Sequence, residues 1–232
     1  MCIILIIILL FVYLIELTHK FQNCVEKYAT KLYIDDKSLC ENLYEKNKNN
    51  KFAIINNFIP TKKCDEILSE GINYAHKNKW TTERHDNYPT TDNEVTQKWK
   101  CYDYLEKKVH GDVFNKISQL YNIDKNNLHI KELFIIKYED TKQNKLITHT
   151  DGNEFSFVMA LNNISEYNGG GTYFVNQQKT IKLRKGNCLV FSGQNKHKGV
   201  AITKGKRFIL TGFINFKSNE FCDDILSENI EK

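Results

Sequence analysis

Three residues in the second half of the chain have the types and the spacing of a metal site. His149 is followed two residues later by Asp151, and residues i and i+2 of an extended strand project from the same face. His197, which follows the strand-like run CLVFS, can add a third ligand. Two imidazoles and one carboxylate on one face of an octahedral ion leave positions open, whereas a structural zinc site is closed. The triad alone does not distinguish an open metal site from an accidental spacing.

Arg207 adds a side chain that can bind an anion. Arginine is rare in this chain, with 3 among 33 basic residues, and Arg207 lies in the alternating run RFILTGF, where it shares one face with Ile209 and Thr211. If this face and the His197 region lie on neighbouring strands of one barrel, the guanidinium can bind a carboxylate in bidentate fashion. Non-haem Fe(II) oxygenases use two histidines and one carboxylate to hold a chelating oxo-acid, so Arg207 favours a dicarboxylate. Tyr138 can donate its hydroxyl to the same carboxylate, or it can be one of 12 tyrosines packed in a sheet.

The elements that must position these residues are mainly strands. A strand is expected in the run FAIINNFI, followed by a helix from Thr61, as its cap, to about Lys79 and a second helix from Tyr104 to Leu120. After these helices come short β-type runs separated by turn residues, LHIKELFIIKY, FSFVMALNNI, GTYFV, KTIKL, CLVFS and RFILTGFINF. The sequence therefore predicts a mainly β sandwich or barrel with supporting helices, with the chemistry in the strand-rich half.

The composition excludes several other classes of protein. The chain has 232 residues with 41% hydrophobic residues, enough for a buried core, and its net charge of +5 is too small to indicate nucleic-acid binding. The 7 cysteines include no CxxC pair, which leaves a zinc ribbon unsupported and disulfide pairing open.

The first residues predict a membrane attachment. Residues 2–15 are uncharged and almost entirely apolar, a length between a signal-peptide core and a spanning helix, and no small-residue cleavage site follows them. We therefore expect an uncleaved single-pass anchor over residues 1–17, a polar linker over residues 18–50, a globular domain over residues 51–216 and a polar tail over residues 217–232.

Three separated runs resemble a known enzyme family. HTDGNEFSFVMALNNISEYNGGGTYF, RKGNCLVFSG and HKGVAITKGKRFILTGF resemble the Fe(II)/2-oxoglutarate dioxygenases of the prolyl 4-hydroxylase and procollagen lysyl hydroxylase family, most closely the lysyl type. The resemblance implies a double-stranded β-helix, or jelly roll. It places the iron ligands and catalytic residues on His149, Asp151 and His197, the 2-oxoglutarate-binding basic residue on Arg207, and further co-substrate contacts on Tyr138 and Thr172.

The same resemblance implies a reaction and its cofactors. An enzyme of this kind uses Fe(II), O₂, 2-oxoglutarate as co-substrate and L-ascorbate, and it hydroxylates an unactivated C–H bond with release of succinate and CO₂. A protein or peptide substrate is implied, with peptidyl proline or lysine as the target. Relatives of the prolyl 4-hydroxylase type favour a domain in the endoplasmic reticulum or secretory lumen, whereas Lys20, Lys27 and Lys31 after the apolar run favour the cytoplasm.

Two alternative functions stay open. A nucleic-acid oxidative demethylase can use the same scaffold, but relatives of that kind carry a second arginine six residues after the first, where this chain has Phe213. A non-catalytic binding or sensing module would be expected to have lost at least one metal ligand, and none is missing here. Oligomeric state cannot be deduced from the sequence.

The segment RHDNYPTTDNEV resembles the family's site entrance. His85 and Asp92 within it can face substrate or can be solvated loop residues. Because loops are usually polar and lie on the surface, we expect the second.

Overall fold

The described part of the chain consists of two facing antiparallel sheets and a layer of helices. The computed structural model describes residues 51–85 and 87–217. The predicted anchor, the linker and all but the first residue of the predicted tail lie outside these residues, so they stay predictions. Within the described residues, no helix is long and apolar enough to cross a membrane.

The sheets differ in size. The larger one has seven strands in the order β1-β9-β5-β11-β3-β2, with β6 paired to β11, and the smaller one has the order β4-β10-β7-β8. The strands are β1 (Phe52–Ile55), β2 (Asp92–Glu94), β3 (Leu128–Glu139), β4 (Leu146–His149), β5 (Phe155–Ala160), β6 (Tyr167–Gly169), β7 (Thr172–Phe174), β8 (Lys179–Ile181), β9 (Cys188–Ser192), β10 (His197–Gly199) and β11 (Ile202–Phe216). The helical segments are α2 (Thr61–Asn78), α3 (Tyr102–Lys108), the π-helical turn η1 (Val109–Val113), α4 (Phe114–Tyr121) and the 3₁₀ turns η2 (Lys125–Asn127) and η3 (Ile164–Glu166).

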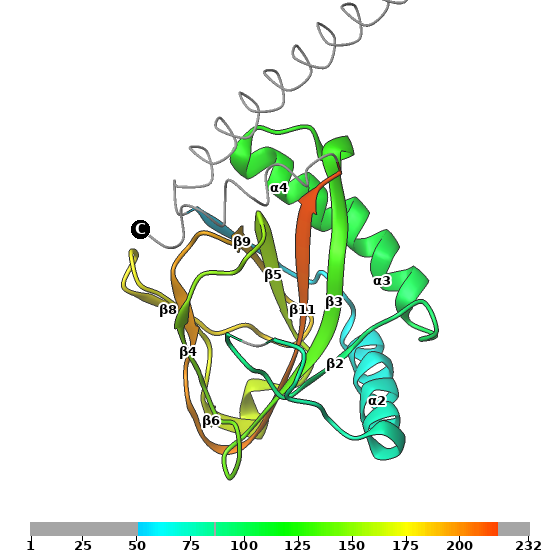
Figure 1. The fold of residues 1–232 in the computed structure, drawn as a ribbon, viewed down its shortest axis with the longest axis vertical. Helices are drawn as coiled ribbons and strands as arrows, with labels where there is room; N and C mark the ends of the chain where they lie inside the picture. Colours follow the sequence, from blue (N-terminus) through cyan, green and yellow to red (C-terminus); the bar gives the residue numbers. More distant parts are fainter. Residues whose placement is uncertain (1–50, 86, 218–232) are drawn as a thin grey trace, which may run out of the picture. The chain divides into compact units, whose positions relative to one another are not determined.

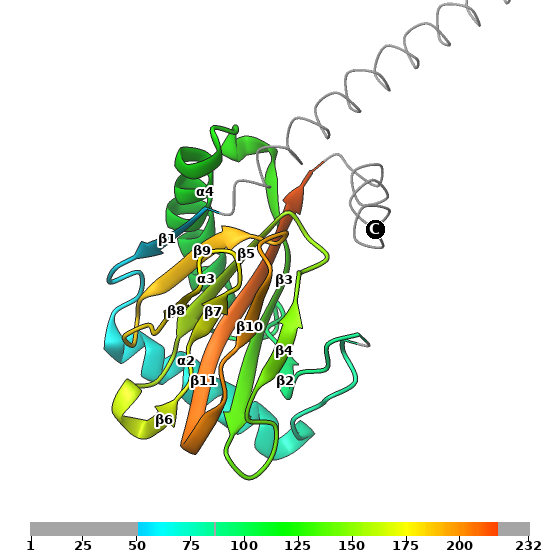
Figure 2. The ribbon, with the colours of Figure 1, turned by 90° about the vertical axis from the view of Figure 1, so that its left-hand side faces the viewer.

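The main core lies between the two sheets. Phe134, Ile136 and Tyr138 alternate along β3 and belong to this buried cluster, as the period of two along a strand requires. The smaller sheet contributes Phe174 and Ile181 from the opposite side. Figure 1 and Figure 2 show the smaller sheet on one side of β3 and β11 and the helices on the other.

The helices cover the outer face of the larger sheet. An added Cβ at Gly71 of α2 would lie 2.8 Å from Ile135 Cδ1, so the helix packs directly on β3. Cys64 and Ile67 are buried on the same helical stripe. Strand β5 and the middle of β3, residues 133–136, are thus buried on both faces, which explains why these stretches appear in the sequence as nearly continuous apolar runs.

Most of the predicted elements are present. The first predicted helix is α2, although Pro60 occupies its N-cap position without a side-chain hydrogen bond, so the predicted Thr61 cap is wrong. The second predicted helix is present as α3, η1 and α4 in succession. All six predicted strand runs form strands. The strands β2, β4, β6 and β10 were not among these runs, although the spacing of His149 and Asp151 suggested an extended strand around β4. They are short, and β2, β6 and β10 consist mostly of polar residues and glycine, so no apolar pattern marks them in the sequence.

Candidate metal centre and co-substrate pocket

The three predicted metal ligands come together between two short strands of the smaller sheet. β10 pairs with β4, and His197 is the direct register partner of His149. Asp151 was predicted to share a strand with His149, but β4 ends at His149 and the aspartate lies in the loop that follows. Its backbone N–H donates to the carbonyl of Gly193 at 2.8 Å, which fixes that loop. Pairing between strands, together with this loop, is what assembles the triad.

The ligand atoms of the triad face one another. One potential ligand atom from each of His149, Asp151 and His197 lies within 4.8 Å of the others, and all three residues are buried. His149 Nε2 is 3.3 Å from Asp151 Oδ1, and His197 Nε2 is 3.8 Å from Asp151 Oδ2. Two imidazole nitrogens and a carboxylate at this spacing suit a divalent transition metal.

Both histidines are oriented by backbone carbonyls. His149 Nδ1 donates to the carbonyl of Ile147, and His197 Nδ1 donates to that of Asn195, each at 2.8 Å. A carbonyl can only accept a hydrogen bond, so each Nδ1 carries the proton and each Nε2 keeps its lone pair. Metal-binding histidines are usually fixed in this way through their second nitrogen. The residues present therefore fit a metal ion.

Asp151 is held in its charged form by its neighbours. Burial alone would raise its pKa, but the imidazoles of His197 and His149 and the Ser156 hydroxyl outweigh burial, so the pKa is lowered. Ser156 Oγ donates to Asp151 Oδ2 and accepts from Asn153 Nδ2 at 3.1 Å. Sequence reasoning missed Ser156. Its signal is a single hydroxyl inside the otherwise apolar and fully buried strand β5.

The two histidines differ in their pKa shifts. Burial opposes protonation of His149, but the hydrogen bond and the charge of Asp151 outweigh it and raise its pKa. For His197 burial dominates and lowers the pKa. A neutral imidazole is the form that binds a metal, so His197 is already in the binding form at neutral pH.

Arg207 and Tyr138 form a neighbouring pair on the larger sheet. They are direct partners in the β11–β3 ladder, and the Arg207 guanidinium lies 5.4 Å from the centre of the Tyr138 ring. From the sequence, Arg207 and the His197 region could lie on neighbouring strands of one barrel, but β11 and β10 belong to the two opposing sheets. Arg207 therefore faces the metal ligands across the space between the sheets rather than along one sheet.

Arg207 is a buried cation without a carboxylate partner among the described residues. It is 4% exposed, and its Nη1 donates a long hydrogen bond of 3.5 Å to the Gly171 carbonyl. Burying an unpaired charge costs free energy, so such a guanidinium favours an anionic ligand. Burial raises the pKa of Tyr138, although the charge of Arg207 opposes this, so its hydroxyl stays protonated and can donate to the same anion.

Thr172 and the glycine turn before it complete this end of the site. Thr172 is buried on β7 and pairs with Gly199 of β10. Gly170 has a φ of +69°, and an added Cβ there would lie 3.3 Å from Arg207 Cδ. The turn thus needs glycine at this position both for the positive φ and to leave room for the Arg207 side chain.

One cavity of about 240 Å³ joins these groups. All six predicted site residues line it, together with residues that the sequence did not single out for the site, among them Tyr88, Thr90, Phe134, Phe191, Thr211 and Phe213. The Tyr88 ring lies 4.8 Å from that of His149 and covers it from the entrance segment.

The entrance segment corrects one expectation. Asp92 was expected to be solvated, but its exposure is 0% because it lies on β2, paired with β3. The expectation is also wrong for His85, whose ring packs 4.9 Å from that of Phe134 and lines the cavity. The segment is folded over the opening of the site rather than extended into solvent.

Comparison with known proteins agrees with this geometry. Residues 133–215 match the family model described as the 2OG-Fe(II) oxygenase superfamily. This segment is a 2OG-Fe(II) oxygenase domain. It begins on β3 and ends on β11, so it contains the triad, Arg207, Tyr138 and Thr172. The predicted family resemblance is confirmed.

Two curated relatives of this superfamily illustrate the similarity. A procollagen lysyl hydroxylase and glycosyltransferase from Acanthamoeba polyphaga mimivirus is 30% identical over 137 residues, which cover 56% of this chain and 15% of that protein. Human procollagen-lysine,2-oxoglutarate 5-dioxygenase 2 is 28% identical over 226 residues, which cover 86% of this chain and 28% of that protein. The chain thus spans less than a third of the length of either relative.

Solved structures of 2OG oxygenases share the fold. The viral collagen prolyl hydroxylase of Paramecium Bursaria Chlorella virus-1 matches with a TM-score of 0.56 and 14% identity, covering 74% of this chain and 99% of that one. A prolyl-4-hydroxylase of Pseudomonas putida matches with a TM-score of 0.60 and 13% identity, covering 77% and 100%. At these identities the likeness shows the fold alone, which agrees with the predicted jelly roll.

Proposed function

We propose that this chain is an Fe(II)- and 2-oxoglutarate-dependent dioxygenase that hydroxylates an unactivated C–H bond of a peptide. The observation that carries the proposal is the shared cavity. It joins an open set of two histidines and one aspartate to a buried arginine that has no carboxylate partner among the described residues. A ligand that chelates the metal at one end and carries a carboxylate at the other would fit both the triad and Arg207.

The triad would hold the iron. His149 and His197 would bind through Nε2, because each Nδ1–H already donates a hydrogen bond to a backbone carbonyl. Asp151 would bind as a carboxylate, which Ser156 and the imidazoles keep charged. When bound, Fe(II) with O₂ and 2-oxoglutarate supplies the oxidising power for hydroxylation, and succinate and CO₂ are released. No side chain of the triad needs to act as a general base.

The larger sheet would orient the co-substrate. Arg207 would pair with the distal carboxylate of 2-oxoglutarate, the Tyr138 hydroxyl would donate to it, and Thr172 would border it from β7. Phe191 packs 4.8 Å from the His197 ring, and Tyr88 covers His149, so aromatic groups limit the access of water to the ligands.

A peptidyl lysine or proline is the substrate that we propose. The support is the similarity to procollagen lysyl hydroxylases and to collagen prolyl hydroxylases. Mass spectrometry of lysine- and proline-containing peptides after incubation with the protein, Fe(II), 2-oxoglutarate and ascorbate should reveal the mass of one added oxygen. A comparison without ascorbate tests whether ascorbate sustains turnover.

Succinate release from 2-oxoglutarate tests the reaction itself. His197→Ala should abolish release by removing a metal ligand, and Arg207→Ala should weaken 2-oxoglutarate binding while the metal stays bound. His76→Gln, at an exposed position of α2, is the matched control and should behave like the wild type. Equal release by the wild type and by His197→Ala across all peptides would refute the proposed activity.

The apolar residues 2–15 support a further proposal, that the full chain is attached to a membrane. Alkaline extraction of membranes from cells that express the full chain should leave it in the pellet. A chain that begins at residue 51 should be recovered in the supernatant, and recovery of both forms there would contradict the attachment.

A further inference from the structure

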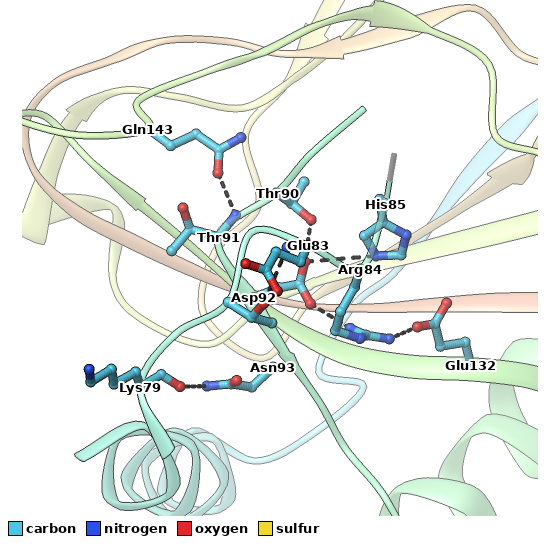
Figure 3. A network of polar contacts seen from close by, with 11 residues as sticks. Lys79, Glu83, Arg84, His85, Thr90, Thr91, Asp92, Asn93, Glu132 and Gln143 are labelled. Carbon is cyan, nitrogen blue, oxygen red and sulfur yellow. Dashed lines mark hydrogen bonds and ion pairs between the residues drawn. The ribbon is translucent and has the colours of Figure 1, made fainter. Parts of the chain in front are cut away.

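The segment that leads to β2 is closed into a loop over the cavity. Thr81 and Asp92 exchange two backbone hydrogen bonds, of 3.1 and 3.0 Å, and so hold the two ends of the loop together. Gln143, between β3 and β4, accepts from the backbone N–H of Thr91 and donates to the carbonyl of Pro89, as Figure 3 shows for Thr91. The loop is therefore fixed at its ends and along its second half.

A partly buried charge network holds Arg84, the residue before His85 (Figure 3). Arg84 Nη1 donates to Asp92 Oδ1 at 2.5 Å, Arg84 Nη2 pairs with Glu132, and the Thr90 hydroxyl donates to Asp92 Oδ2. Asp92 is fully buried, and Arg84 is the only cation of this network that is permanently charged. Breaking a buried ion pair from one side is costly, so the network fixes the backbone next to His85.

His85 is the side chain that this network places in the cavity. Its Nε2 lies 3.7 Å from Asp92 Oδ2, beyond hydrogen-bond distance, and its ring packs between Phe134, at 4.9 Å, and Phe213, at 6.1 Å. Burial lowers the pKa of His85 against the pull of Asp92, so the imidazole is neutral and can either donate or accept a hydrogen bond. None of the groups proposed above for metal or 2-oxoglutarate binding uses it.

Thr211 adds a second unused polar group at the same end. Its hydroxyl is buried, lines the cavity and has no hydrogen-bond partner among the described residues. Arg207 and Thr211 share the inner face of β11, and four residues of extended strand span about 13 Å. The cavity therefore has two polar ends, one at Arg207 and one at Thr211 and His85, with Phe134 and Phe213 forming the walls of the second.

We propose that His85, together with Thr211, forms the hydrogen-bonding contact for the substrate and that His85 is a specificity-determining residue. This inference rests on the proposed function, in which the Arg207 end holds 2-oxoglutarate and the other end is left for the peptide. The aromatic walls suit the apolar stem of a side chain, and the two unpaired polar groups suit a hydrogen-bonding atom near it. Asp92, Arg84 and Thr90 are positioning residues that act through His85.

His85→Phe is the first test, because phenylalanine keeps the ring packing and removes both nitrogens. The probes are collagen-like Gly-X-Y peptides with lysine or proline at Y. Loss of one hydrogen bond is expected to raise the peptide KM about tenfold. The KM for 2-oxoglutarate and the peptide-independent release of succinate should stay within twofold. His76→Phe, on the exposed side of α2, is the control and should change neither value.

Thr211→Val separates a substrate contact from a structural role. Valine has nearly the same shape, and removing a hydroxyl that has no partner should leave stability unchanged or increased. A substrate contact predicts that the peptide KM rises about as much as in His85→Phe, although the fold is no less stable. Asp92→Asn should raise the peptide KM through His85, and its effect should be small when added to His85→Phe.

The outcomes distinguish this inference from the proposed function. An unchanged peptide KM in both His85→Phe and Thr211→Val, or an equal loss of 2-oxoglutarate affinity, would overturn it while leaving the dioxygenase activity intact. If the wild type releases no succinate with any peptide, the proposed function fails. In that case, the inference about His85 is tested by measuring, through tryptophan fluorescence, the binding of the same peptides to the protein loaded with Mn(II) and 2-oxoglutarate. Absent binding, or equal binding by His85→Phe, overturns the inference as well.

Discussion

At the scale of single residues, hydrogen bonds fix the orientation of each metal-ligating side chain and leave its metal-binding atom available to a metal ion. The two histidines each donate a hydrogen bond from Nδ1 to the carbonyl two residues earlier in the chain, that of Ile147 or Asn195. Asp151 is held by the Ser156 hydroxyl, which in turn accepts from Asn153. These second contacts set the orientation of the ligands before any metal is bound.

Ser156→Ala tests this orientation. Removing the hydroxyl leaves Asp151 without the donor that fixes its Oδ2, so metal affinity should fall about tenfold or more. Competitive titration with Co(II) measures the change, and Ser69→Ala on the exposed side of α2 serves as the control. Unchanged affinity would mean that the imidazoles alone position the carboxylate.

The site residues that could be predicted from the sequence differ physically from those that could not, because only the former have roles that follow from residue type and spacing. Arg207 and the triad could be recognised because their residue types are rare or specifically spaced and their chemistry is intrinsic. The roles of Ser156 and His85 arise only from proximity in three dimensions. Asp92 was misjudged for the same reason, since only the pairing of β2 with β3 buries it.

At the scale of elements, the long strands carry the fold and the short ones carry the ligands. β3 and β11 are long and were predicted from their β-type runs, whereas β4 and β10 have four and three residues and were not among the predicted runs. The metal site is built on the latter two, because their pairing sets His149 opposite His197. The least regular part of the sheet structure is thus the part that positions the ligands.

Gly212 shows how closely β11 packs on its neighbours. An added Cβ there would lie 2.2 Å from Phe157 Cε1 and 2.8 Å from Leu133 Cδ2. Gly212→Ala should therefore destabilise the fold by about 1–3 kcal/mol through overpacking. Gly111→Ala, where nothing lies within 4 Å, should instead stabilise the helical segment by about 0.5–1 kcal/mol. Urea unfolding measures both, and equal effects at the two sites would contradict the packing described here.

Glu139 connects the end of β3 to the start of β11 and predicts a response to acid. Its carboxylate accepts from Lys206 and Lys137, each at 3.0 Å, and these bonds lower its pKa from 4.5 to about 2. A lowered pKa stabilises the folded state above pH 4.5, and this contribution is lost as the pH falls towards 2. Glu139→Gln should flatten the acid side of the stability curve in urea unfolding between those values. Parallel curves for the two proteins would show that the lysines contribute nothing.

At the scale of the whole described domain, the two sheets divide the proposed chemistry between them. The smaller sheet and the loop after β4 hold the triad, and the larger sheet holds Arg207 and Tyr138. A metal alone would bind only to the groups held by the smaller sheet, and a dicarboxylate alone would bind chiefly to those on the larger sheet. Together they would connect the sheets across the cavity, so their effects on stability should not be independent.

This coupling can be measured by thermal unfolding of the metal-free chain. Co(II) with 2-oxoglutarate should raise the unfolding temperature by more than the sum of the two separate shifts, because each ligand increases the affinity for the other. Arg207→Ala should keep the shift caused by Co(II) and lose the excess, since it removes the contact on the larger sheet. His197→Ala should lose both. Additive shifts in the wild type would show that the metal site and Arg207 do not hold a common ligand.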